Sequence, residues 1–350
     1  MEKFTILSDP KILYKKMLKD IALAKRYIFL ETYIYDNDVI GDRFKNLLIK
    51  KAKQGVKVKL LVDAWGSSAD RNYFKKLIDS GAEFRFFQEF RYVIRIFSKN
   101  HERNHRKLLV IDDNITYIGS ANITKTCLDW RELVIRLEGD ISPLFAEAFL
   151  HSWESYDKQA SKRIKSLIHR QFEIIRDIPS STYRVTERRY IQLINQARNK
   201  IMIETPYFVP SISIRSALSK AVKRGVKVLI ILPYISDIRI MNLVRNRYLG
   251  LLYKNGINIY YFMPKRLHSK LLIVDDRIFL LGSSNVDYRS FIHQYEINFI
   301  GKNREMILAL KNYFNKTLSK SKPFNYEEWR KRSSIKKIHE RILFLIREYL

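Results

Sequence analysis

Residues 27–112 of this chain return in altered form in residues 200–275, and this internal duplication limits the possible folds more than any other feature. Three segments recur in the same order, 173, 170 and 163 residues apart. The pairs are Tyr27–Tyr35 with Lys200–Phe208, Lys51–Val58 with Ala221–Val228, and His105–Asp112 with His268–Asp275. A slow drift in spacing is typical of loop insertions and deletions between duplicated domains. We therefore expect two related halves.

Each copy alternates helix and strand patterns. In the first copy, Gly55 suits the C-terminus of the second helix. The order expected there is a helix near 10–26, a strand at 27–35, a helix at 41–54, a strand at 56–62, a helix near 70–80, and strands near 83–88, 107–111, 115–118 and 133–137. Such alternation favours an α/β fold with helices on the faces of a sheet, and the closely spaced late strands predict hairpins in a mixed sheet.

The two copies set the domain boundaries that we expect. The first half covers residues 1–160 and the second covers 187–320. Residues 161–186 are interpreted as a linker that includes the turn-rich Pro179–Thr182, and 321–350 as a C-terminal amphipathic helical tail. The sequence thus predicts two duplicated α/β halves, each a mixed β-sheet flanked by helices.

The amino-acid composition limits the classes of binding partner but does not distinguish between them. The chain has 65 Lys plus Arg against 36 Asp plus Glu, a formal net charge of +29. Such a surface attracts polyanions, either nucleic acid or anionic lipid headgroups, although general compositional drift is an alternative explanation. The single cysteine, Cys127, excludes an intrachain disulfide. Met1–Pro10 lacks a signal-peptide pattern, and no apolar run approaches the roughly 20 residues that span a bilayer, so we expect a soluble or peripheral protein.

Both copies carry the pattern His-x-Lys-x4-Asp-x6-Gly-Ser-x-Asn. Its members are His105, Lys107, Asp112, Gly119, Ser120 and Asn122 in the first copy, and His268, Lys270, Asp275, Gly282, Ser283 and Asn285 in the second. A glutamate follows each asparagine, Glu132 after 10 residues and Glu296 after 11. The chain has only seven histidines, and chance does not readily place two of them in the same six-position pattern.

The spacing of this pattern has a physical meaning on strands. Residues i and i+2 share one face of a strand, so His105 and Lys107 project together. A second strand then runs back and brings the Gly-Ser-x-Asn segment level with the histidine, where glycine admits close backbone approach. Neutral donors beside an ammonium suit phosphate oxygens, so we expect four residues to bind substrate: Ser120, Asn122, Ser283 and Asn285. Two halves packed face to face would surround one phosphorus.

Histidine suits phosphotransfer because its neutral form is a nucleophile and its pKa lies near working pH. One histidine can attack while the other protonates the leaving oxygen, and we expect Glu132 and Glu296 to orient them as the carboxylate does in a triad. The repeated motif assigns six residues to catalysis: His105, Lys107, Asp112, His268, Lys270 and Asp275. Within it, Asp112 and Asp275 lie on the opposite strand parity from the histidines, which indicates a structural or supporting role.

Two alternatives compete with catalysis. A lone histidine before an apolar strand is usually structural, but a duplicated sheet would not need His and Lys at matching sites. A metal site would need a cluster of His or Cys ligands, and the lysines would repel a cation. The pattern therefore favours catalysis without a metal.

At these residues the chain resembles the phospholipase D superfamily, whose hallmark is the doubled His-x-Lys-x4-Asp motif. The resemblance extends from about residue 10 to 320. It implies two related α/β halves that share one active site and form a covalent phosphohistidine without a metal or other cofactor. Within the superfamily the chain is most similar to bacterial cardiolipin synthases, through the segments Asn104–Lys107, Trp130–Gly139, Glu204–Pro210, Leu267–Lys270, Gly282–Ser290 and Glu296–Asn298. It departs from many members in lacking transmembrane helices and in having Ser120 in place of a second glycine.

The resemblance implies a ping-pong transfer. A histidine takes the phosphatidyl group of a phospholipid, releases glycerol or another headgroup alcohol, and passes the group to a second alcohol such as phosphatidylglycerol. The symmetric motifs do not show which histidine attacks, but the resemblance to other superfamily members implies that His105 is the nucleophile and His268 the acid and base. Hydrolysis to phosphatidic acid, nuclease activity and a non-enzymatic binding scaffold are the alternatives.

Anionic phospholipids and a membrane surface are the expected partners, nucleic acid is less favoured, and a monomer suffices for one active site. The expected location is the cytoplasm, at the inner face of the bacterial plasma membrane. Apolar residues at 335, 338, 342, 345 and 349 with basic flanks predict an amphipathic helix that either lies on an anionic bilayer or packs on the protein's own core. The aromatic stretch Phe84–Phe97 ends in Tyr92–Phe97, which is either a lipid-facing loop or a buried strand.

Overall fold

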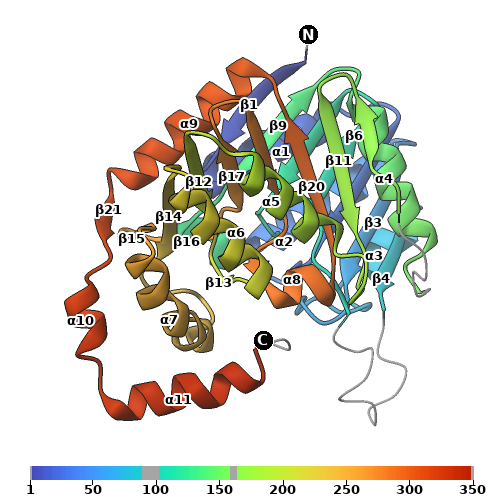
Figure 1. The fold of residues 1–350 in the computed structure, drawn as a ribbon. Helices are drawn as coiled ribbons and strands as arrows, with labels where there is room; N and C mark the ends of the chain where they lie inside the picture. The colour runs from blue at the N-terminus through green and yellow to red at the C-terminus, as the bar shows by residue number, and fades with distance from the viewer. Residues whose placement is uncertain (1, 89–101, 158–163, 348–350) are drawn as a thin grey trace.

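The computed structural model describes residues 2–88, 102–157 and 164–347, and its first half is a helix-flanked sheet (Figure 1). The elements of this half, in chain order, are β1 (Lys3–Leu7), α1 (Pro10–Leu23), β2 (Tyr27–Thr32), α2 (Val39–Lys53), β3 (Lys57–Asp63), α3 (Lys75–Asp79), β4 (Glu83–Phe87), β5 (Arg103–Asn104), β6 (Leu108–Ile111), β7 (Ile115–Gly119), the 3-10 helix η2 (Lys125–Asp129), β8 (Trp130–Arg131), β9 (Val134–Glu138) and α4 (Ser142–Glu154).

The second half repeats this plan and ends in a tail. Its elements are β10 (Leu167–His169), β11 (Phe172–Asp177), α5 (Val185–Gln196), β12 (Lys200–Glu204), β13 (Phe208–Val209), α6 (Ile212–Lys223), β14 (Lys227–Pro233), α7 (Arg239–Lys254), β15 (Asn258–Phe262), β16 (Arg266–Leu267), β17 (Leu271–Val274), β18 (Ile278–Gly282), β19 (Val286–Asp287), α8 (Tyr288–Ile292), β20 (Gln294–Gly301) and α9 (Arg304–Leu318). The tail contains β21 (Ser321–Pro323), α10 (Tyr326–Arg330) and α11 (Ser334–Leu345).

The two main sheets have the same strand order. The first runs β1-β9-β7-β6-β2-β3-β4, and the second runs β11-β20-β18-β17-β12-β14-β15, with β10 and β21 added at its edges. In each sheet three parallel strands (β2, β3 and β4, or β12, β14 and β15) adjoin antiparallel hairpins. The prediction of two duplicated α/β halves with mixed sheets is therefore confirmed.

Alternate residues of the central strands enter different cores. Leu108 and Leu271 belong to one buried cluster that contains side chains of both sheets and of helices α4 and α9. Their neighbours Leu109 and Leu272 belong instead to two outer clusters, one in each half. Because side chains alternate across a strand, each sheet packs toward the other half on one face and against its own helices on the opposite face.

The predicted linker at 161–186 is wrong for residues 167–177, which form β10 and β11. β11 pairs antiparallel with β20, in the place that β1 takes beside β9 in the first half. Glu173, Arg176 and Asp177 interrupt its apolar pattern, which concealed the strand. Pairing with a neighbouring strand, which no local pattern reveals, stabilises this segment.

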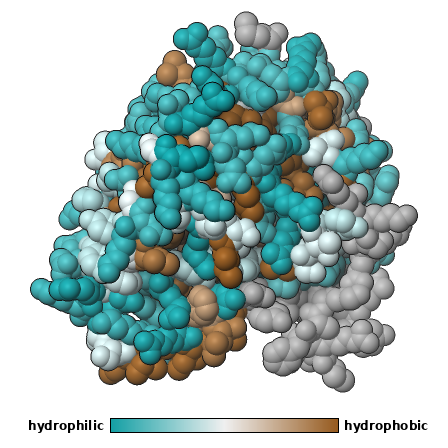
Figure 2. Space-filling model, in the orientation of Figure 1, coloured by the Kyte–Doolittle hydropathy of each residue, from teal (hydrophilic) through white to brown (hydrophobic). Residues whose placement is uncertain are grey.

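The tail is more than a helix, because β21 pairs with the edge strand β15 before α10 and α11 begin. α11 packs on α7 and also exposes apolar side chains, which appear as a brown band along the lower edge of Figure 2. Residues 84–87 of the aromatic stretch belong to β4, whereas its end at 92–97 lies outside the described residues. Among the described helices, none has both the length and the apolar character needed to cross a bilayer.

Candidate active site

A cavity of about 480 Å³ opens where the two halves meet. Both predicted histidines and both predicted asparagines line it, together with aromatic, acidic and basic side chains. The lining residues are Tyr33, Ile34, Trp65, Gly66, His105, Asn122, Trp130, Tyr207, Asp237, Ile238, Ile240, Met241, His268, Asn285, Asp287, Arg289 and Gln294. The duplicated motifs thus converge on one cavity.

Two short ladders cross between the halves and place the histidines. β5 of the first half pairs parallel with β20 of the second, and β16 of the second half pairs parallel with β8 of the first. The ladders continue one residue further, since the His105 amide donates to the Tyr295 carbonyl at 3.0 Å and the His268 amide to the Arg131 carbonyl at 2.9 Å. Each histidine is therefore held against the strand that leads to the other half's glutamate.

The histidine–glutamate pairs are consequently exchanged between the halves. His105 Nδ1 lies 3.0 Å from Glu296 Oε1, and His268 Nδ1 lies 3.0 and 3.1 Å from the two carboxylate oxygens of Glu132. All four side chains are buried. With Nδ1 facing a glutamate, Nε2 of each ring is the nitrogen left for chemistry.

The predicted substrate-binding role of the serines does not fit this geometry. The Ser120 hydroxyl donates to Glu132, and the Ser283 hydroxyl donates to Glu296. Each hydroxyl also accepts a backbone N–H, from Leu133 at 2.9 Å and from Ile297 at 3.0 Å. Both serines are fully buried and neither lines the cavity, so they hold the glutamates in place.

The asparagines face the cavity, and their binding of substrate stays a prediction. The Asn122 side-chain oxygen accepts the backbone N–H of Ile34 at 3.2 Å, which leaves its NH₂ group available. The buried side-chain oxygen of Asn285 has no hydrogen-bond partner within the described residues. Both amides therefore retain polar atoms that a ligand can use.

Two buried lysines stand behind the histidines. Lys107 Nζ donates to the His105 carbonyl at 2.6 Å, and Lys270 Nζ donates to the His268 carbonyl at 2.7 Å. Burial, assisted by repulsion from Lys270, lowers the pKa of Lys107 to about 7, and burial lowers that of Lys270 to about 8. Negative groups only partly balance the charge of these buried ammonium groups. An anion that enters the site therefore stabilises their charged form.

Burial also acts on both imidazoles. It lowers the pKa of His105 well below the usual range, with further lowering by Lys107 and Lys270. Burial lowers the pKa of His268 as well, but attraction to Glu132 opposes that shift. Burial therefore favours the neutral form of both imidazoles, and Glu132 makes the protonated form less unfavourable at His268 than at His105.

The two motif aspartates lie far from this chemistry. Asp112 accepts the backbone N–H groups of Lys25, Arg26 and Tyr27 at 2.6 to 2.8 Å, and Asp275 accepts those of residues 198–200 at 2.8 Å. Each aspartate is seven residues from its histidine, roughly 23 Å along an extended chain. Assigning them to catalysis does not fit this distance, which agrees with the structural role that their strand parity indicated.

Several cavity residues were missed by the sequence reasoning. The ring of Tyr33 meets His105 edge-on at 5.1 Å, and that of Trp130 meets His268 at 4.9 Å. The Tyr207 hydroxyl donates to Asp237 at 2.8 Å. Tyr33 directly follows the first Glu-Thr pair and Tyr207 follows the second after one proline, so the segments after these repeated pairs were the signal available for them.

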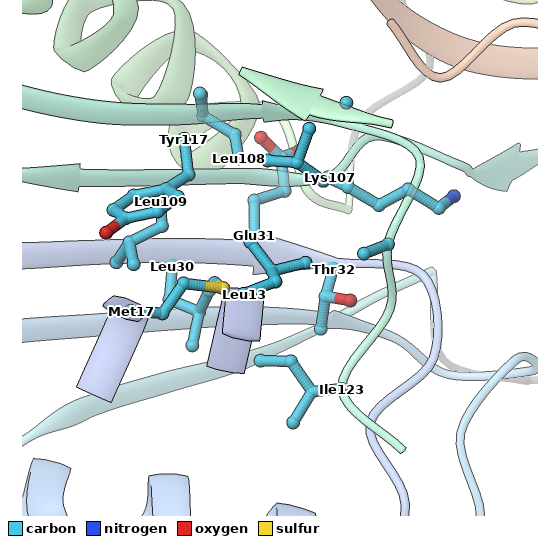
Figure 3. Close-up of a pocket in the computed structure, with 13 residues that line it drawn as sticks. Leu13, Met17, Leu30, Glu31, Thr32, Lys107, Leu108, Leu109, Tyr117 and Ile123 are labelled. Atoms are coloured by element: carbon cyan, nitrogen blue, oxygen red, sulfur yellow. The ribbon is translucent and has the colours of Figure 1, made fainter. Parts of the chain in front are cut away.

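The repeated Glu-Thr pair also contributes buried carboxylates. Glu31 accepts from the Asn104 side-chain amide at 2.7 Å, and Glu204 accepts from the Tyr313 hydroxyl at 2.8 Å. A cavity of only about 20 Å³, lined by Glu31 together with apolar residues, lies between α1 and β2, β6 and β7 (Figure 3). This volume is about that of one water, and Lys107 runs away from the apolar lining, so it is a packing gap and not a substrate site.

Comparisons with known proteins identify the family of this chain. The family described as "Cardiolipin synthase, PLD-like domain" matches residues 17–153 and 190–318. A cardiolipin synthase of Clostridium perfringens is 32% identical over 97% of this chain and 75% of its own length, and the major cardiolipin synthase ClsA of Bacillus subtilis is 31% identical over 97% and 74%. Phosphatidylserine synthase of Haemophilus influenzae has the same fold, with a TM-score of 0.77 at 14% identity over 99% of this chain and 95% of that one.

Proposed function

Because the chain belongs to the family of PLD-like cardiolipin synthases, enzymes of the phospholipase D superfamily, we propose that it is a phosphatidyltransferase that makes cardiolipin. The donor is phosphatidylglycerol or another phospholipid. One observation carries the proposal: two buried histidines, each paired with the other half's glutamate, line a single cavity backed by two lysines. The proposed location is the inner face of the plasma membrane.

In the first step, His105 attacks the phosphorus of the donor. A bond forms between its Nε2 and phosphorus, and the bond from phosphorus to the headgroup oxygen breaks. His268 gives its proton to the departing oxygen, so that glycerol leaves as a neutral alcohol. The low proton affinity of His105 and the glutamate beside His268 support this division of roles.

In the second step, a phospholipid hydroxyl replaces the departed alcohol. His268 takes the hydroxyl proton, the oxygen attacks phosphorus, and the bond to His105 breaks. The pair returns to its starting protonation, so no oxidant, reductant or further reactant is consumed.

Charge accumulates on the phosphoryl oxygens during both steps. Lys107 and Lys270 bring positive charge from behind the two histidines, and the Asn122 and Asn285 amides offer neutral donors at the cavity surface. Donors fixed in advance at a water-poor site stabilise such charge without reorganising during the reaction. Glu132 and Glu296 stabilise the charge that the imidazoles gain.

The acceptor separates this function from a hydrolase of the same fold. Incubation with vesicles that contain labelled phosphatidylglycerol should give labelled cardiolipin and free glycerol. Phosphatidic acid as the main product would identify a phospholipase D. Cleavage of DNA without a lipid product would identify a nuclease and refute the lipid assignment.

A further inference from the structure

Helix α11 presents an apolar face to solvent. Ile335, Ile338, Ile342 and Leu345 are 67, 52, 57 and 77% exposed. Their spacing places them on one side of a helix. In Figure 2 this side forms the brown band at the lower edge of the molecule. Four large exposed aliphatic side chains aligned in this way indicate a surface that a lipid bilayer or another molecule covers.

The opposite side of α11 encloses a basic groove against α7. The groove has a volume of about 340 Å³ and is lined by Arg215, Arg247, Tyr248, Leu251, Trp329, Arg332, Lys337, Glu340, Arg341 and Phe344. Five of these side chains are cationic and one is a carboxylate, so the lining has a formal net charge of +4. Arg332 neutralises that carboxylate through bonds of 2.8 and 2.7 Å to Glu340.

The groove also holds polar groups that lack partners. The buried hydroxyl of Tyr248 has no hydrogen-bond partner within the described residues. The exposed Arg341 makes no hydrogen bond or ion pair in the described part of the chain. Arg215 lies 4.5 Å from the Tyr248 ring and Arg247 lies 4.6 Å from the Phe344 ring, so both guanidinium groups are held in position. Fixed guanidinium groups beside an unpaired hydroxyl suit a phosphate group.

Helix α7 connects this groove to the catalytic cavity. Met241 lines the cavity, and Arg247, six residues later and roughly 9 Å along the helix, lines the groove. At the other end of α11, Arg347 lies 5.4 Å from the ring of Tyr288, whose neighbours in sequence Asp287 and Arg289 line the cavity. The groove therefore lies within about two helical turns of the catalytic cavity along α7.

We propose that α11 docks this protein on a membrane, and that the groove binds the phosphate headgroup of an anionic phospholipid that does not itself react. The apolar face enters the acyl boundary while the basic lining attracts the negative leaflet, as amphipathic surface helices do. The inference rests on the proposed function in placing the substrate within a bilayer. Docking needs no turnover, however, so the two can fail separately.

Vesicle flotation with three variants tests the inference. Ile338→Asp with Ile342→Asp disrupts the apolar face, and Arg247→Ala with Arg341→Glu disrupts the groove. Ile168→Asp is the matched control, because Ile168 is 72% exposed on β10 and far from α11 in the chain. Hydrolysis of bis(p-nitrophenyl) phosphate, a soluble phosphodiester, reports whether the catalytic site remains intact. Arg341→Glu alone replaces the groove pair if the double variant does not fold.

Each double variant should reduce binding to phosphatidylglycerol vesicles at least about tenfold, with Ile168→Asp unchanged and soluble turnover within about twofold of the parent. Parent-like binding by the groove variant would refute the headgroup site. Parent-like binding by the apolar variant would refute docking through α11. If that variant instead converts a dimer to a monomer in sedimentation velocity, the face binds a second copy and the inference is wrong. Absence of diester turnover in the parent would count against the proposed function and not against docking.

Discussion

The two histidine–glutamate pairs occupy matching places in two halves of identical strand order, yet they are not equivalent. His268 Nδ1 lies within 3.1 Å of both oxygens of Glu132, whereas His105 Nδ1 contacts one oxygen of Glu296. Burial raises the pKa of both glutamates, but attraction and hydrogen bonding from His268 prevail at Glu132 and lower its pKa to about 2. Burial prevails at Glu296 and raises its pKa to about 7.

The partner histidine accounts for much of this difference, because His268 attracts and hydrogen-bonds Glu132, whereas burial outweighs the attraction of Lys107 at Glu296. Burial, with a smaller contribution from repulsion by Glu296, raises the pKa of Asp177 and of Asp287 to about 6. Glu132 instead has the hydroxyl of Tyr14 and the thiol of Cys127 nearby, which are neutral. Duplication thus supplied two histidines in matching positions, and their surroundings lower the pKa of His105 further than that of His268.

The largest expected effect comes from removing either imidazole. His105→Ala and His268→Ala should each reduce lipid turnover by at least about 10³-fold, because the first removes the nucleophile and the second the proton carrier. p-Nitrophenolate leaves without being protonated, so an activated donor that carries this leaving group does not need His268 in the first step. Release of p-nitrophenolate in the first turnover should therefore persist in His268→Ala and be lost in His105→Ala. Stopped-flow absorbance measures that release, with the exposed His151→Ala as control. Equal bursts in both variants would remove the distinction between the histidines.

Replacing each glutamate by glutamine should show that the two histidine–glutamate pairs contribute unequally to kcat. Glu132→Gln removes an ionised partner from His268 and should lower kcat roughly 10²- to 10⁴-fold. Glu296→Gln removes a carboxyl that is half protonated near pH 7 and should cost only about tenfold. Steady-state kinetics of both variants at pH 7 measures the two losses of kcat. A larger loss in Glu296→Gln would reverse the assignment of the proton carrier.

The buried lysines predict an alkaline limb in the pH profile. A lysine loses its charge as pH rises through its pKa, so kcat/KM should fall above about pH 7 to 8 as Lys107 and Lys270 become neutral. In Lys270→Gln the limb due to Lys107 should move to higher pH, since repulsion from Lys270 is gone. Profiles from about pH 5.5 to 9 test this. A limb that stays in place would show that the lysines do not interact.

The smallest effect, equal in both halves, should come from the motif aspartates. Asp112→Asn and Asp275→Asn weaken charge-assisted bonds to backbone N–H groups, which should lower the free energy of unfolding by about 1–3 kcal/mol. Turnover of the folded variants should stay within about twofold, because each aspartate lies at the far end of its strand. Denaturant unfolding and kcat, measured side by side, check this. A hundredfold loss of kcat in a stable variant would return the aspartates to the catalytic machinery.

Local patterns predicted what lies within one half. The repeat predicted the two α/β halves, and strand parity predicted that His105 and Lys107 project from the same face of a strand. The exchange of glutamates could not be predicted, because it depends on β5 with β20 and β8 with β16, ladders of two residues that have no periodicity. Ser120 was assigned to substrate, whereas its hydroxyl donates to Glu132 of the same half, a contact between side chains that the spacing of the motif does not reveal.

The site chemistry can be tested most directly by trapping the intermediate. In His268→Ala no base activates the acceptor, so a phosphatidyl group loaded from an activated donor should remain on the protein. Mass spectrometry of the digested protein should then find the adduct on the peptide that contains His105. An adduct on another residue, or none at all alongside release of the leaving group, would contradict the unequal roles assigned to the two histidines.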